Sequence, residues 1–101
     1  MSPDKQRIAI AKTCGYTQGV GMNGLEWWTN SEGVHDEPPD YTNDLNAMHA
    51  AEKTISGPDF ETELWTHYLI NLGKVVNKRR AHATAAQRAE AFLRTLNLWK
   101  P

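Results

Sequence analysis

The chain has 101 residues, of which 40% are apolar and 23% are charged, and this composition is typical of one globular domain. Its formal net charge of −1 gives no field that would steer the molecule onto DNA or a membrane. The single cysteine, Cys14, excludes an internal disulfide. The sequence contains no apolar run of about 18 residues, so no membrane span is predicted. The first residues also lack a signal-peptide pattern. We expect one domain over residues 1–101 in the cytoplasm.

The first predicted helix covers residues 3–14. Ser2, Pro3 and Asp4 form a typical helix start, with a cap residue, a proline in the first turn and an early acid. Gly15 is a natural stop at the other end.

Residues 15–40 contain five glycines and two prolines and are predicted to be mostly loop. Only the aromatic stretch 25–30 looks like a strand. Trp27 and Trp28 would then point to opposite faces. We expect one of them to enter the core, and the other to be exposed or to line a pocket or an interface.

Two helices are predicted in the middle of the chain, at 41–55 and 59–72. The first follows Pro38-Pro39 and carries an apolar stripe of Tyr41, Leu45, Met48, Ala51 and Ile55. The second repeats apolar residues every four positions and is predicted to stop at Gly73. After it, Val75-Val76 and residues 80–84 have the character of short strands, and 80–84 is expected to pair with 25–29.

The last helix, at 85–96, has the clearest local signal. Thr84 and Gln87 fit a capping box, in which each side chain satisfies a backbone N–H at the helix start. Asn97 fits the left-handed position after the helix. The patterns together predict a helix-rich α+β fold with about four helices and a short antiparallel sheet.

Charge is divided between two segments. Residues 26–63 carry ten acids and one base, whereas residues 74–100 carry seven bases and one acid. One interpretation is pairing of the two segments within the chain, or between chains. The other is a basic anion pocket at the Thr84 helix start, where Arg79, Arg80 and Arg88 lie close in sequence to free backbone N–H groups.

Three segments together resemble the small phage proteins grouped as the phage ABA-sandwich domain family. They are PDYTNDLNAMHAAEK at 39–53, the tryptophan pair at 27–28, and HATAAQRAEAFLRTLNLW at 82–99. The resemblance implies a small α/β sandwich, a phage or prophage origin and hence the host cytoplasm. It implies no catalytic activity and no cofactor.

Neither an enzyme nor a metal site is expected. The sequence has no G-x-S-x-G, P-loop or paired-carboxylate motif, and its histidines lack zinc-site spacing. The acids at the entrance of the helix at 41–55, Asp40 and Asp44, suit helix capping and would repel an anion. Asn46 and His49 lie one turn apart, and both can reach one ligand.

The first function hypothesis is a phage anti-defence sponge, which sequesters a small anionic ligand such as a nucleotide second messenger. The ligand base would stack on Trp28 or Tyr41, and Asn46 and His49 would read its polar edges. Its phosphates would meet the basic pocket, whose residues are Arg79, Arg80, His82, Thr84 and Arg88. The alternative is a protein-interaction module that inhibits a host protein or serves phage assembly. A homo-oligomer is expected in either case, with no DNA or membrane partner.

Overall fold

The structure is a computed structural model that describes residues 1–22, 24, 26–58, 60, 62–76 and 82–100. Within these residues it contains four helices and one two-stranded antiparallel sheet. The elements are α1 (Pro3–Thr13), β1 (Thr17–Val20), β2 (Glu26–Thr29), α2 (Leu45–Ser56), α3 (Glu63–Val76) and α4 (Ala85–Thr95). The predicted helix-rich α+β class is therefore confirmed.

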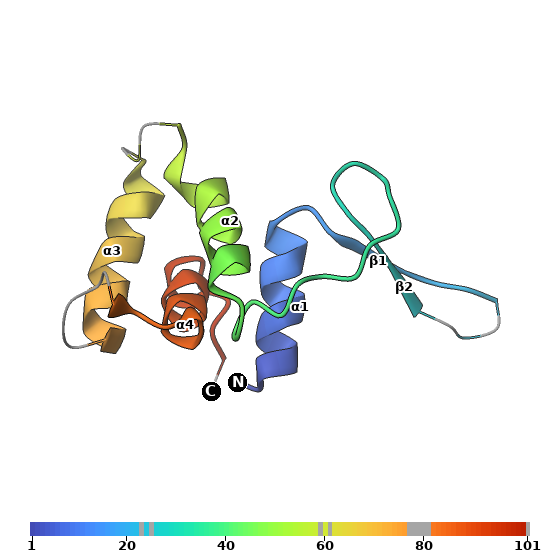
Figure 1. Cartoon of the computed structure of the whole chain (residues 1–101), viewed down its shortest axis with the longest axis horizontal. Coiled ribbons are helices and arrows are strands. Elements are labelled where there is room, and N and C mark those ends of the chain that lie inside the picture. Colours follow the sequence, from blue (N-terminus) through green and yellow to red (C-terminus); the bar gives the residue numbers. More distant parts are fainter. Residues whose placement is uncertain (23, 25, 59, 61, 77–81, 101) are drawn as a thin grey trace.

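Helix α4 is the centre of the helical body, because α1, α2 and α3 all pack against it (Figure 1). Ala89, Phe92 and Leu93 on its apolar face are completely buried, and Leu96, predicted to share this face, is partly buried against the core. The other helices each contribute side chains to the same core. These are Ile10 and Ala11 from α1, Met48, Ala51 and Ile55 from α2, and Tyr68 and Leu72 from α3.

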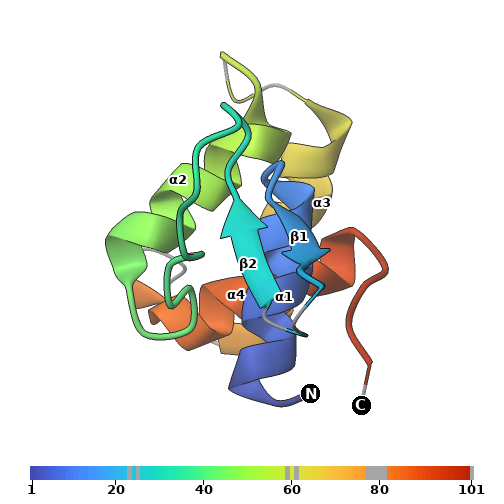
Figure 2. The ribbon, with the colours of Figure 1, turned by 90° about the vertical axis from the view of Figure 1, so that its right-hand side faces the viewer.

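The two strands form a hairpin arm, residues 17–29, which stands off the end of the helical body beside α1 (Figures 1 and 2). The strands pair from Thr17 opposite Thr29 to Val20 opposite Glu26. The arm elongates the molecule to 48 × 29 × 22 Å.

The bounds of α2 and α3 differ from the sequence prediction, and α3 continues through Gly73, where it was expected to stop, to Val76. The helix expected from position 41 begins at Leu45, because Asp44 caps it and residues 41–43 form a turn. Leu45, which was predicted to lie on the apolar stripe, is the first residue of α2 and is exposed. The strand expected at Val75-Val76 is wrong, since both valines belong to the last turn of α3 and pack against the core from there.

The expected pairing of residues 80–84 with 25–29 is also wrong for the part that is described. The strand prediction at 25–30 is confirmed as β2, but its partner is β1, in the segment predicted to be loop. Residues 80 and 81 lie outside the described residues, and Ala83 and Thr84 form the irregular entry to α4.

Both ends of α4 have the predicted chemistry. The Thr84 hydroxyl accepts from the Gln87 N–H at 3.1 Å, and the Thr84 N–H donates to the Gln87 side chain at 2.9 Å. After the helix, Asn97 has φ 58°, and the Leu98 N–H donates to the Leu93 carbonyl at 2.8 Å. These bonds satisfy the terminal groups that a helix leaves unpaired.

We expect Thr84→Ala to lower the free energy of unfolding by about 1 kcal/mol, because the Gln87 N–H loses its acceptor. In thermal denaturation this corresponds to a fall in Tm of about 4–8 °C for a domain of this size. Thr66→Ala, at an exposed position inside α3, is the control and should change stability by less than about 0.5 kcal/mol. Equal losses for the two variants would contradict the capping role.

Candidate functional site

The two aromatic rings expected to stack on a ligand are both buried. Trp28 is 9% exposed on the side of the arm that faces α1, whereas Trp27, on the opposite face, is 40% exposed. Tyr41 is buried and hydrogen bonded to the thiol of Cys14, and burial raises the pKa of both groups. Of the tryptophan pair at 27–28, Trp27 is the one that a ligand can reach.

The other predicted site residues are divided between two regions. Asn46 and His49 are exposed on α2, one turn apart as expected. His82 is exposed just before α4, where Thr84 serves as the cap. Arg79 and Arg80 lie outside the described residues. Two of the predicted site residues, His49 and Arg88, contact the same carboxylate group.

That carboxylate belongs to Glu52, the buried centre of a polar group that we call the Glu52 cluster (His49, Glu52, Tyr68 and Arg88). Glu52 Oε2 accepts from Arg88 Nη1 at 2.7 Å and from the Tyr68 hydroxyl. Glu52 Oε1 lies 3.0 Å from His49 Nδ1. The side chains of Glu52 and Arg88 are only 5% and 12% exposed, so this ion pair is shielded from solvent.

The guanidinium group of Arg88 is bound within the protein by Glu52. Burial lowers the pKa of the Arg88 guanidinium, but the bond and charge of Glu52 outweigh this effect and raise the pKa overall. Arg88 Nε also donates to the Ala83 carbonyl at 3.4 Å. For Arg88, pairing with the acidic segment of the chain is therefore what the structure shows, and Glu52 lies where a ligand phosphate was expected.

The tyrosines give stability a predictable dependence on alkaline pH. Burial, together with the hydrogen bond and charge of Glu52, raises the pKa of Tyr68, and burial raises that of Tyr41. The folded state thus keeps protons that the unfolded state loses at about pH 10. This contribution is fully present below about pH 10 and is lost as the pH rises toward the folded-state values.

We expect the urea midpoint to fall above about pH 10, and Tyr68→Phe to show a shallower fall because one of the shifted groups is absent. Urea denaturation from about pH 8 to pH 11 measures both curves. An identical decline in the two proteins would show that Tyr68 does not contribute.

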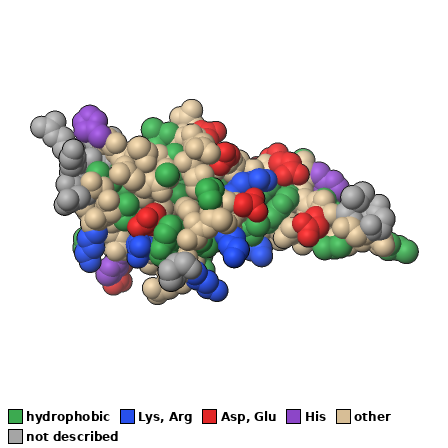
Figure 3. Space-filling view, turned by 90° about the horizontal axis from the view of Figure 1, so that it is seen from below, with side chains coloured by type: hydrophobic (Ala, Val, Ile, Leu, Met, Phe, Trp, Pro, Cys, Tyr) green, Lys and Arg blue, Asp and Glu red, His purple; other side chains and the backbone are tan. Residues whose placement is uncertain are grey.

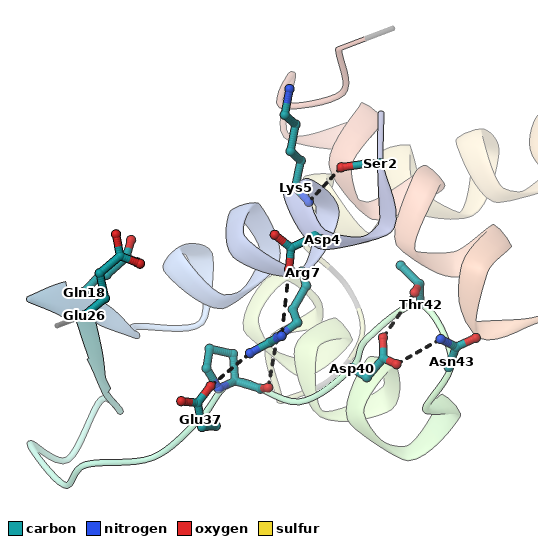
Figure 4. Close-up of polar contacts among 11 residues, drawn as sticks. Ser2, Asp4, Lys5, Arg7, Gln18, Glu26, Glu37, Asp40, Thr42 and Asn43 are labelled. Atoms are coloured by element: carbon teal, nitrogen blue, oxygen red, sulfur yellow. Dashed lines mark hydrogen bonds and ion pairs between the residues drawn. The ribbon is translucent and has the colours of Figure 1, made fainter.

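The entrance of α2 is occupied by capping contacts. Asp40 accepts from Thr42 Oγ1 at 3.2 Å and from Asn43 Nδ2 at 2.9 Å (Figure 4). Asp44 accepts from the Ala47 N–H at 3.2 Å. The Asp44 bond confirms that residue as the cap of α2, whereas Asp40 holds side chains of the turn before the helix.

Arg7 holds the preceding loop against α1. Its Nη2 donates to Glu37 Oε2 at 3.1 Å and its Nε donates to the Pro38 carbonyl at 3.2 Å. Asp4 lies 3.9 Å from the same guanidinium. Two small cavities of about 350 and 270 Å³ adjoin Arg7, and acids in the lining of both make them poor places for an anion.

A larger open groove of about 470 Å³ lies on another face of α1, and we call it the α1 groove. It is lined by Lys5, Ile8, Ala9, Lys12, Thr13 and Leu98. The first four are spaced i, i+3, i+4 and i+7 and therefore share one helix face. In Figure 4 the Lys5 side chain points away from the Arg7 contacts.

The α1 groove combines an apolar floor with positive ends. Lys5 and Lys12 are separated by about 10 Å along the helix axis, with Ile8 and Ala9 between them. The described residues that line the groove include these two bases and no acid. Sequence reasoning missed this site, although the signal was present as two lysines seven residues apart beside apolar positions of the first helix.

Two further findings concern the described residues alone. They contain no group of three or more His, Cys, Asp or Glu side chains placed to bind a metal ion. None of their helices has both the length and the apolarity needed to cross a membrane.

No protein-family model, curated protein or solved structure matches this chain. The resemblance to the phage ABA-sandwich domain family, and the phage origin that it implies, therefore stay predictions.

Proposed function

We propose that this protein is a non-catalytic binding protein that holds a small anionic molecule in the α1 groove. The observation that carries the proposal is the pair of lysines, Lys5 and Lys12, at the two ends of an apolar floor. The groove volume of about 470 Å³ falls within the range of about 300–1,000 Å³ common for small-molecule sites. An ammonium group is a compact charge with three rotatable donors, well suited to a phosphate or carboxylate.

The proposed ligand has an apolar ring or body and at least one anionic group. The apolar body would cover Ile8, Ala9 and Leu98, and the anionic group would meet Lys5 or Lys12. A nucleotide second messenger has both features. Its sequestration in the host cytoplasm, as a phage counter to host defence, is the role that we propose from the family resemblance.

The anion site that we propose lies in the α1 groove and not at the start of α4. Arg88 is held by Glu52 and Ala83 there, so binding a phosphate would require breaking a buried ion pair. Truncating one partner of such a pair typically costs about 3–5 kcal/mol. The lysines of the α1 groove bring no such cost, because no acid lines the described part of the groove.

Calorimetric titration against cyclic mononucleotides, cyclic dinucleotides and ADP-ribose tests this function. We expect at least one to bind with a Kd well below 1 mM, and about 1.4 kcal/mol accompanies each tenfold gain in affinity. Lys5→Glu and Lys12→Glu should each weaken binding by about tenfold or more, because each puts an acid beside the ligand anion.

Lys74→Glu on α3 is the matched control, since Lys74 is an exposed helix lysine that does not line the α1 groove. It should leave Kd unchanged. Binding of none of these nucleotides tighter than about 1 mM would reject the nucleotide class. Equal weakening by Lys74→Glu would reject the groove as the site.

A second candidate function, the protein-interaction module, is favoured by the hairpin arm. Val20, Met22 and Trp27 are exposed on the arm, and Val34 is exposed in the loop that follows it. Hydrophobic side chains are visible at the end of the molecule that the arm forms (Figure 3). Apolar patches of this kind often mark contact surfaces. If this is the function, host-protein capture is lost in arm variants such as Met22→Asp and kept in Lys5→Glu. If nucleotide binding is the function, Lys5→Glu weakens ligand binding and Met22→Asp leaves it unchanged.

A further inference from the structure

The two edges of the hairpin arm differ in the described part of the chain. The outer edge of β2 is covered by the loop that follows it, through a bridge between Thr29 and His35. The Asp36 N–H also donates to the Trp28 carbonyl at 3.1 Å. Among the described residues, β1 has no backbone hydrogen bond to any segment other than β2, so its outer edge is open.

The open edge lacks the charges and prolines that usually keep strand edges apart. Natural edge strands carry lysines, prolines or bulges that block pairing with another chain. The four residues of β1, Thr-Gln-Gly-Val, include no charge and no proline. Val20 is 64% exposed and Met22 beyond it is fully exposed. A two-stranded hairpin is only marginally stable in water, so an arm of this kind gains stability from additional strands.

We propose that β1 pairs with β1 of a second copy of this chain, antiparallel and around a two-fold axis. The product is a four-stranded sheet with the strand order β2, β1, partner β1 and partner β2. A two-fold axis requires each copy to use the same patch, and a strand edge meets this requirement because it can pair with itself. The net charge of −1 adds little repulsion between copies. This interface is separate from the α1 groove and does not depend on the proposed ligand.

Gly19 fixes the expected register. It pairs with Trp27, and the indole covers it so closely that a Cβ on Gly19 would lie 2.6 Å from Trp27 Cε2. Aromatic cover of a strand glycine is a known stabilising device. With the axis at Gly19, one cross-strand row would contain Trp27, Gly19, the partner's Gly19 and the partner's Trp27.

In this register the two indoles converge over the dimer axis. Neighbouring strands are about 4.8 Å apart, and each indole already lies over its own glycine. The contact would cover the exposed face of Trp27, which is 40% exposed in the single chain. On the other face of the sheet, Val20 would lie opposite the partner's Gln18.

Light scattering and sedimentation over a range of protein concentrations test the proposal. We expect the wild-type chain to show twice the mass of one chain at high concentration. Val20→Lys should raise the dimer dissociation constant by about tenfold or more, because it puts a charge into each open edge. Val34→Lys is the matched control, since Val34 is an apolar residue of similar exposure, 56%, beyond the other strand, and it should dimerise as the wild type does.

Amide hydrogen exchange provides a second measurement that needs no variant. Protection of the outward-facing amides of β1 should increase with protein concentration, whereas protection within α4 should not change. A chain that stays monomeric at about millimolar concentration, or a dimer that Val34→Lys breaks and Val20→Lys does not, would overturn the proposal. Lys5→Glu should dimerise normally, so a failed ligand titration leaves this test unaffected.

Discussion

Arg88→Met is expected to lower the free energy of unfolding by about 3–5 kcal/mol, because it leaves the Glu52 carboxylate buried without its cation. The total stability of a domain is typically about 5–15 kcal/mol, so this single change removes a large share of it. Glu52 would keep the Tyr68 hydroxyl and His49, which satisfy its hydrogen bonds but do not replace the buried charge. Urea denaturation followed by circular dichroism measures the loss.

Two further variants separate the buried pair from an ordinary surface pair. Arg94→Met breaks the exposed contact between Arg94 and Glu90 and the contact of Arg94 with the Trp99 ring, and should cost only about 1 kcal/mol. The double variant Glu52→Leu with Arg88→Met removes both buried charges and should recover much of the stability lost by Arg88→Met alone. Similar losses for Arg88→Met and Arg94→Met would contradict the structural role of the Glu52 cluster.

Phe92→Ala is expected to be the other severe change, with a loss of about 3–5 kcal/mol. Phe92 has no exposed surface and lies on α4, against which the other three described helices pack. Its ring meets Tyr68 edge to face, with the ring centroids 6.5 Å apart. Truncation would therefore leave a cavity at the centre of the helical body, which neighbouring side chains refill only in part.

The matched control for Phe92 is Phe60→Ala. Phe60 is more than half exposed and touches Trp65 at the edge of the fold, so its truncation should cost about 1 kcal/mol or less. Equal urea midpoints for the two variants would show that α4 is not the centre of the core.

Helix α4 could be predicted from sequence almost completely because its signals are local. The Thr84 cap, the apolar face and the left-handed Asn97 all lie within the helix or next to it. Strand β1 could not be predicted in this way. It is four residues long, contains Gly19 and is fixed by its pairing with β2 rather than by its own pattern.

The candidate site was less predictable because burial and pairing depend on residues far apart in the chain. Glu52 is one of ten acids in its segment, and its role appears only when Tyr68 and Arg88 are brought to it from α3 and α4. The α1 groove likewise requires Leu98, which reaches α1 from the opposite end of the sequence. Spacing alone could place Lys5 and Lys12 on one face, but not the apolar wall beside them.

The proposed function is tested most directly by an NMR titration of the ¹⁵N-labelled protein with cyclic dinucleotides, cyclic mononucleotides and ADP-ribose. A binding nucleotide should shift the amide signals of the α1 groove, at Lys5, Ile8, Ala9, Lys12 and Leu98. It should leave those of Glu52 and Arg88 in place, since that ion pair is expected to stay closed. Absence of shifts with every nucleotide, or shifts confined to the start of α4, would contradict the assignment of the α1 groove as the binding site.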